Sequence, residues 1–96
     1  MIRHICMFKL KEENKVENLQ EALVRVQELK ELTTIHSYQV VTNVEGTPDT
    51  NYDLSLIFDF KSLGDLEDYQ KDPRHLEFGA YIRSVRKERA CIDYEF

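Results

Sequence analysis

Apolar residues occur at both even-numbered and odd-numbered positions of residues 2–10, so this segment is predicted to be a strand covered on each side. Cys6 and Phe8 share one parity, whereas Ile5 and Met7 share the other. Side chains point to opposite faces at successive strand positions, and neither Gly nor Pro interrupts the run. The pattern is therefore typical of a strand without a solvent-facing side.

Residues 15–32 repeat their apolar positions at intervals of three and four, which predicts a long amphipathic helix. The apolar stripe consists of Val16, Leu19, Leu23, Val26 and Leu29. Asn14 and Glu17 stand at the start in an N-x-x-E pattern, in which the Asn side chain accepts a backbone N–H and the Glu reaches back. We expect Asn14 to cap this helix.

Residues 35–44 and 52–60 are predicted to form a β-hairpin. The first run is rich in β-branched residues, and the second alternates between a mixed parity and an apolar parity that includes Leu56. Gly46 and Pro48 lie in the cluster of turn residues that joins the two runs.

A short helix is predicted after Ser62, which stands three residues before Asp65 in a second helix-start pattern. Leu63, Leu66 and Tyr69 would lie along one side of this helix. The stretch is predicted to contribute one apolar side to the core.

Asp72 and Pro73 predict another helical piece, with Asp72 as its N-cap and Pro73 at its first position. Pro73 must also end or kink the preceding helix. We expect the new piece to run to about Ser84, with a last strand over residues 86–94.

The predicted order of elements is β-α-β-β-α-β in a chain of 96 residues, the length of one domain. No internal repeat or linker divides residues 1–96. We therefore expect a single α+β domain with a ferredoxin-like fold, in which helices cover one face of a four-stranded antiparallel sheet.

The other face of that sheet is predicted to be too apolar to be plainly solvated. It would carry Arg3, Ile5, Met7, Asp53, Ile57 and Asp59. No other element of the chain covers it, and a two-fold dimer is the commonest way to bury such a surface. We expect a homodimer; the alternative is a monomer with scattered exposed apolar residues.

Composition and charge narrow the class of protein. Apolar residues make up 42% of the chain and charged residues 32%, with only 3 Gly and 2 Pro, which excludes disordered and low-complexity classes. A net charge of -5 repels phosphate backbones, so no nucleic-acid partner is expected. No apolar run approaches the roughly 20 residues of a membrane span, and no secretory signal is visible. We expect no membrane partner and a cytoplasmic location.

Cys6 and Cys91 lie far apart in the sequence and have neither C-x-x-C nor metal-finger spacing. In a cytoplasmic chain they are expected to be free, buried and reduced. The chain has no phosphate-binding loop, serine-hydrolase elbow or zinc-protease motif. Neither a cofactor nor a metal is expected.

The candidate chemistry centres on His75 and Tyr69. If Asp72 caps its helix, His75 stands in the first turn, where unpaired N–H groups and the helix dipole disfavour an imidazolium and so favour a neutral base. Tyr69 would lie near the same corner and could donate a hydrogen bond to a substrate oxygen. The alternative is a core Tyr69 and a solvated His75. His4 shares its parity with Cys6, which by itself is more typical of a satisfied buried histidine.

Asp68, Tyr69, Pro73 and His75 form a D-Y-x-x-x-P-x-H motif. The opening Arg3-His4-Ile5-Cys6-Met7-Phe8-Lys9-Leu10, the Tyr52-Asp53-Leu54 strand and the closing Ile92-Asp93-Tyr94 accompany it. With these features the chain resembles the stress-responsive A/B barrel (Dabb) domain family over almost its whole length. The resemblance implies a ferredoxin-like protomer and a dimeric α/β barrel. Fold alone assigns no reaction.

Within that family the nearest enzymatic likeness is to a plant polyketide cyclase, olivetolic acid cyclase, which implies that Tyr69 and His75 are catalytic. It also implies a small pocket between the sheet and the helices. The substrate pocket is expected to include His4, Cys6, Leu23, Val26 and Leu56. The resemblance favours a cofactor-independent cyclase, lyase or isomerase with a His base and a Tyr donor. The alternative is a non-catalytic, stress-associated or small-ligand-binding dimer.

Overall fold

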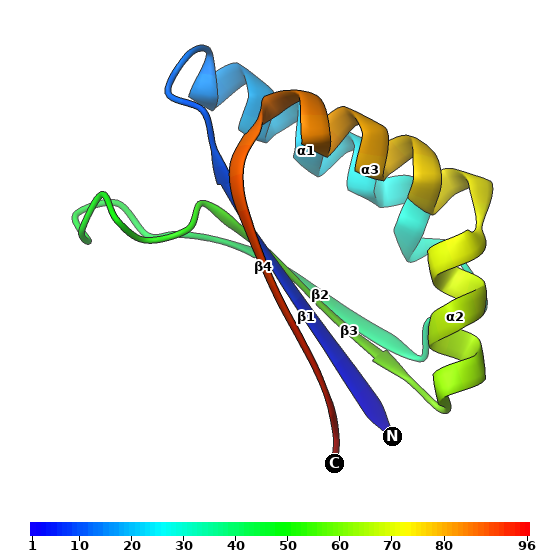
Figure 1. Ribbon diagram of the computed structural model, residues 1–96. Coiled ribbons are helices and arrows are strands. Elements are labelled where there is room, and N and C mark those ends of the chain that lie inside the picture. The colour runs from blue at the N-terminus through cyan, green and yellow to red at the C-terminus, as the bar shows by residue number, and fades with distance from the viewer.

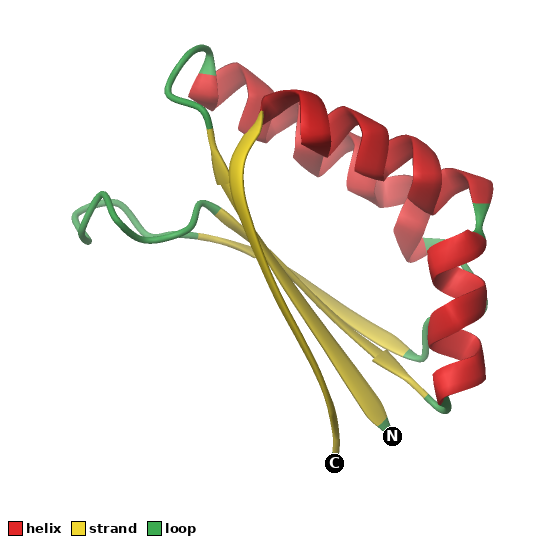
Figure 2. Cartoon of the chain, viewed as in Figure 1, coloured by secondary structure: helices red, strands yellow, loops and turns green.

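The computed structural model describes residues 1–96 as one four-stranded sheet with three helices on one of its faces (Figure 1). In chain order the elements are β1 (Ile2–Leu10), α1 (Lys15–Lys30), β2 (Ser37–Thr42), β3 (Leu54–Phe60), α2 (Leu63–Lys71), α3 (Pro73–Val85) and β4 (Arg86–Glu95). Figure 2 shows the helices in one layer, with no helix on the opposite side of the sheet. None of the helices has both the length and the apolar character that crossing a membrane requires.

The strands follow the order β2-β3-β1-β4, and every neighbouring pair is antiparallel. In this register Cys6 on β1 lies between Leu56 on β3 and Cys91 on β4. Strand β1 is thus central, whereas β4 forms an edge of the sheet. The predicted ferredoxin-like α+β fold, with its second helical region in two pieces, is confirmed.

Two of the three predicted helix starts are confirmed in atomic detail. The Ser62 hydroxyl accepts a hydrogen bond from the Asp65 amide over 3.1 Å, and the Asp72 carboxylate accepts one from the Arg74 amide over 2.8 Å. The prediction that the Asn14 side chain caps the first helix is wrong. Asn14 adopts a left-handed conformation with φ of 55°, from which its side chain makes no capping hydrogen bond.

The core lies between the sheet and the helix layer. It contains sixteen buried apolar residues, among which Val26, Leu29, Phe58 and Phe60 have no exposed surface. The prediction that Val16 and Leu63 belong to the buried apolar sides of their helices is wrong, because Val16 is 66% exposed and Leu63 is 58% exposed. Each lies in the first turn of its helix, so the apolar spacing in the sequence extends beyond the part of the helix that covers the sheet.

The face of the sheet away from the helices, here termed the outer sheet face, is uncovered and carries both apolar and polar side chains. Its apolar members are Ile5, Met7, Val41, Ile57, Ala90, Ile92 and Tyr94, with the polar Ser37, Gln39 and Ser55 among them. At one end Arg3 forms an ion pair with Asp59 over 2.8 Å. Asp53, which the sequence pattern placed on this face, lies before β3, and its carboxylate accepts a hydrogen bond from the Leu10 amide.

Candidate functional site

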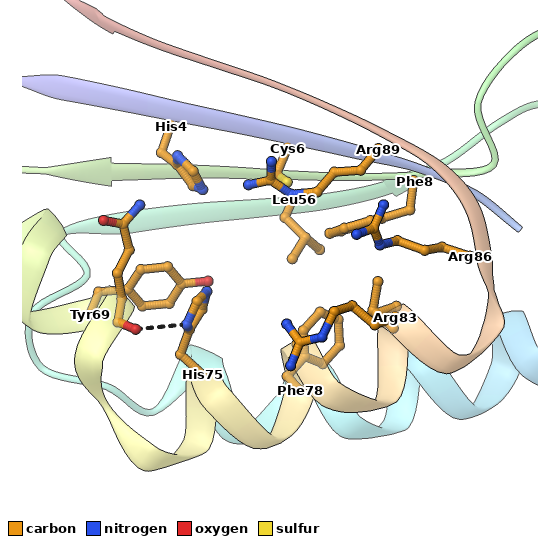
Figure 3. Close-up of a pocket in the computed structure, with 13 residues that line it drawn as sticks. His4, Cys6, Phe8, Leu56, Tyr69, His75, Phe78, Arg83, Arg86 and Arg89 are labelled. Carbon is orange, nitrogen blue, oxygen red and sulfur yellow. Dashed lines mark hydrogen bonds between the residues drawn. The ribbon is translucent and has the colours of Figure 1, made fainter.

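A cavity of about 370 Å³ lies between α3 and the β1–β4 side of the sheet (Figure 3). Its walls consist of His4, Cys6, Phe8, Leu56, Tyr69, Gln70, His75, Phe78, Gly79, Ile82, Arg83, Arg86 and Arg89. The volume falls in the range of small-molecule sites, and the walls combine apolar side chains with a few convergent polar groups. The fold therefore brings His75, Tyr69, His4, Cys6 and Leu56, five of the predicted site residues, around one cavity.

His75 is held by the junction between α2 and α3. Pro73 begins α3, and the Asp72 carboxylate faces the Arg74 amide, so Asp72 caps the helix as predicted. The Nδ1–H of His75 donates a hydrogen bond to the Gln70 carbonyl over 3.0 Å. Neutral His75 then carries its proton on Nδ1, and Nε2 is free to accept another proton.

The pKa of His75 lies below its ordinary value. Partial burial is the largest cause, because it penalises the imidazolium, and electrostatic repulsion from the neighbouring His4, Arg89 and Arg83 lowers the pKa of His75 further. The hydrogen bond to Gln70 works in the opposite direction. A neutral His75 was expected from the helix dipole, whereas in the structure burial and neighbouring cations cause the shift.

Tyr69 is buried at the end of α2 and presents its hydroxyl to the cavity. Its ring packs against Phe60 at 5.2 Å and Phe58 at 5.6 Å, and the His75 ring lies 4.6 Å away, between ring centroids. The hydroxyl makes no hydrogen bond within the chain, which leaves it free to donate to a bound molecule. Burial raises the pKa of Tyr69 well above its ordinary value, so the phenol stays protonated.

His4 is a buried and satisfied histidine that also lines the cavity. The Asp93 carboxylate accepts a hydrogen bond from its Nδ1 atom, so His4 is linked across the β1–β4 pair. The Cys91 sulfur lies 3.6 Å from the same nitrogen. His4 is thus a buried histidine with a hydrogen-bond partner, as expected from its place on the same strand face as Cys6. It also lies in the cavity wall, the position that the family likeness implies.

Cys6 and Cys91 face each other across the β1–β4 pair as free thiols. Cys6 is buried, and burial raises its pKa to about 12. The expectation that both thiols are buried is wrong for Cys91, because β4 is an edge strand whose helix-facing side is only partly covered.

One nitrogen of His4 and the two sulfurs lie within 4.8 Å of one another, close enough to hold a soft ion such as Zn²⁺. No other group of three His, Cys or acidic side chains comes together in this way. The expected absence of a metal stays a prediction.

Leu23 and Val26 do not line the cavity. Val26 is fully buried in the core, and Leu23 packs against the core from α1. The cavity is formed by α3, the end of α2 and the sheet, so a pocket wall inferred for α1 falls in the packed layer instead.

Arg83, Arg86 and Arg89 line the cavity without having been expected there. Their only sequence signal is a concentration of cations, since residues 83–89 hold four of the 13 Lys and Arg in an acidic chain. The chain leaves α3 at Val85 and returns along β4, which brings all three guanidinium groups to one space. Spacing alone does not show that reversal.

Comparison with known proteins gives a family match and several structural relatives. The family model described as the stress responsive A/B barrel domain matches residues 2–96. The search of curated proteins returned no match.

The chain is similar to a dimeric ferredoxin-like protein of unknown function from Bacteroides fragilis, with 27% identity and a TM-score of 0.80 over 99% of this chain and 95% of the other. A Dabb family protein from Mesorhizobium loti superposes with a TM-score of 0.83 at 20% identity, over 99% and 95% of the two chains. A hydroxynitrile lyase from Passiflora edulis superposes with a TM-score of 0.82 at 14% identity, over 97% and 90%.

Proposed function

Because the chain belongs to the stress responsive A/B barrel domain (Dabb) family, we propose that it is a homodimer whose cavity binds and transforms a small molecule. The proposed reaction is a cofactor-independent lyase, cyclase or isomerase step that begins with removal of a proton next to a carbonyl. His75 is the base and Tyr69 the hydrogen-bond donor. Two free thiols that face each other fit a reducing, cytoplasmic location.

The observation that carries this proposal is the hydrogen bond from His75 to Gln70 beside the Tyr69 ring. It leaves Nε2 of His75 as the acceptor, in a group whose lowered pKa keeps it neutral at pH 7. A base that is unprotonated at the working pH and faces a cavity meets the first requirement for general base catalysis.

In the proposed step His75 accepts the proton and Tyr69 stabilises the negative charge of the enolate. Nε2 of His75 takes the proton from carbon, the electron pair of the C–H bond forms a C=C bond, and the π pair of the carbonyl moves onto its oxygen to give an enolate. The protonated Tyr69 phenol donates a hydrogen bond to that oxygen, which stabilises the developing charge. The Gln70 carbonyl stabilises the imidazolium through Nδ1–H until His75 returns the proton.

The enolate can then react in three ways, which define the reaction class. Protonation at another carbon gives an isomer, attack on a second carbonyl of the same molecule closes a ring, and expulsion of a leaving group completes a lyase reaction. The hydroxynitrile lyase from Passiflora edulis has the same fold, so this fold accommodates lyase chemistry. At 14% identity that likeness assigns no reaction to this chain.

The dimeric part of the proposal is supported by the outer sheet face. Ile5 pairs with Ile57 on one side and with Ile92 on the other, which forms an apolar row across three strands. The Bacteroides fragilis relative is itself described as dimeric. A second copy placed on this face would bury the apolar row symmetrically.

Exchange of carbon-bound protons tests the catalytic step without knowledge of the natural substrate. We expect the protein in D₂O to accelerate exchange next to the ketone of 4-phenylbutan-2-one or 4-phenyl-2-oxobutanoate, followed by ¹H NMR. His75→Gln should lower the enzymatic exchange rate by about 10² to 10⁴. His36→Gln is the matched control, because His36 is exposed and lies outside the cavity walls.

The rival function is a ligand-binding dimer without catalysis. It predicts that both ketones exchange at the buffer rate with the wild-type protein, while small molecules still bind in the cavity. That combination would replace the proposed enzymatic role, and the homodimer would be retained.

A further inference from the structure

The cavity contains three guanidinium groups and no carboxylate. Arg83, Arg86 and Arg89 line it, and none of its thirteen wall residues is Asp or Glu. None of the three arginines takes part in an ion pair anywhere in the chain. Arg83 and Arg89 are exposed and Arg86 is half-buried, so the cluster is open to solvent and to a ligand and has no carboxylate of this chain as a partner.

A purely structural role accounts for only part of the cluster. Arg83 lies in the last turn of α3, where a cation interacts favourably with the helix dipole. Arg89 lies in β4 beyond the end of the helix, so the dipole effect, which fades within the last turn, does not apply to it. Figure 3 shows all three side chains directed into the space between α3 and the sheet.

We infer that the cavity binds an organic carboxylate, with the carboxylate held by Arg83, Arg86 and Arg89. Planar guanidinium groups match the two oxygens of a carboxylate, and charge-assisted hydrogen bonds of this type are stronger than neutral ones. The apolar part of the ligand rests against Phe8, Leu56 and Phe78, which line the same cavity. An acid with an apolar body therefore fits the walls better than inorganic phosphate does.

The substrate class follows from the distance between the arginines and the base. Arg83 lies eight residues after His75 on α3, but its side chain reaches back along the helix: its Nη1 atom lies 3.4 Å from the position of a Cβ at Gly79, which is about 6 Å from His75 along the helix axis. A ligand that contacts both His75 and Arg83 can therefore carry its carboxylate close to the reacting carbon, at the arginine end of the cavity. In this step, which rests on the proposed function, the substrate is a keto acid whose carboxylate lies close to its ketone. Its reacting carbon lies next to this ketone at the His75 end.

Binding of two matched probes tests the inference separately from catalysis. 4-Phenyl-2-oxobutanoate and 4-phenylbutan-2-one share a phenyl group and a ketone, but only the first has a carboxylate. We expect isothermal titration calorimetry to show the acid binding at least tenfold more tightly than the neutral ketone. Raising KCl from 50 to 500 mM should weaken binding of the acid and leave that of the ketone unchanged.

Substitutions then locate the carboxylate. Arg83→Gln, Arg86→Gln and Arg89→Gln should each weaken binding of the acid about tenfold, and Arg→Lys should restore part of the loss. Arg74→Gln is the control, because Arg74 belongs to the same helix but not to the cavity walls. Circular dichroism checks that each variant is folded.

The outcomes separate the inference from the proposed function. Equal affinity for the two probes, or inorganic phosphate displacing the acid at equal concentration, would overturn the carboxylate site. Binding of the acid to wild type and to His75→Gln alike, with no proton exchange by either, would keep the carboxylate site and overturn the catalytic proposal.

Discussion

His75 donates from Nδ1 to the backbone carbonyl of Gln70 over 3.0 Å, and this bond joins the start of α3 to the end of α2. The donor is five residues after the acceptor, so Pro73 and the capping Asp72 lie in the turn between them. One short junction thus sets the tautomer of the proposed base and places its ring 4.6 Å from that of Tyr69, between centroids.

The pH dependence of the reaction should follow His75. Its pKa is lowered from the ordinary 6.5, mainly by burial, so the rate of proton exchange should fall on acidification with a midpoint below pH 6.5, as His75 is protonated, and should level off at higher pH. An NMR titration should give His75 a midpoint below 6.5, with His75→Gln identifying its signals. A midpoint above 6.5 would remove His75 as a base at neutral pH.

The same shift predicts the direction in which stability depends on pH. Since the pKa of His75 is lower in the folded protein than in the unfolded chain, the unfolded chain binds more protons in the window below 6.5. The contribution of His75 to stability is therefore complete above pH 6.5 and is lost as the pH falls through that window. Urea unfolding at several pH values should show a smaller acid loss for His75→Gln than for wild type.

Tyr69→Phe should separate catalysis from packing. The Tyr69 hydroxyl has no hydrogen-bond partner in the chain, so its removal should change the free energy of unfolding by less than about 1 kcal/mol. Loss of the donor should lower the rate of proton exchange by about 10². Tyr69→Ala empties a buried ring position and should cost about 3 to 5 kcal/mol. A Tyr69→Phe variant with the wild-type rate would exclude the phenol as a donor.

Local sequence signals predicted the fold and the junction between α2 and α3 that holds His75 near Tyr69. Alternation in residues 52–60 and the caps at Ser62 and Asp72 act over a few residues, so they can be read without tertiary information. The capping role of Asn14 was wrong because a residue type that favours a cap also tolerates the left-handed conformation that it adopts here.

The polar end of the cavity could not be predicted in this way. Arg86 and Arg89 face the cavity because β4 pairs with β1, a contact between opposite ends of the chain. Leu23 and Val26 were placed in the pocket by the likeness to the polyketide cyclase, and their periodicity identifies a buried helix face but not the element against which it packs. Both outcomes depend on tertiary packing, which no short pattern encodes.

The two thiols should differ in reactivity. Cys6 is buried with a pKa of about 12, so almost no thiolate forms at pH 8, whereas Cys91 is exposed on the edge strand. We expect a disulfide reagent such as DTNB to label one thiol per chain rapidly under native conditions. Cys91→Ser should abolish this rapid phase and Cys6→Ser should retain it. Equal labelling of both thiols would contradict the burial of Cys6.

Gly79→Ala should stabilise the protein without displacing Arg83. Gly79 lies inside α3, where alanine is favoured over glycine by about 0.5 to 1 kcal/mol. The added Cβ would stand 3.4 Å from the Nη1 atom of Arg83, which is a van der Waals contact that a flexible side chain accepts. We expect a higher melting temperature together with unchanged binding of 4-phenyl-2-oxobutanoate. A variant with weaker binding would contradict the fit of a Cβ beside the guanidinium.

Ile92→Glu should dissociate the proposed dimer. Ile92 is 59% exposed on the outer sheet face, beside Ile5, and a charge there would be buried without a partner at a two-fold interface. A stable interface of this kind should exceed about 1,200 Å² in total, so light scattering should report twice the chain mass for wild type across dilution and the monomer mass for Ile92→Glu. Val24→Glu is the matched control, because Val24 is 66% exposed on α1, in the layer on the opposite side of the sheet. A wild-type mass of 11.4 kDa at all concentrations would rule out the dimer, and dissociation by Val24→Glu instead would move the interface to the helix layer.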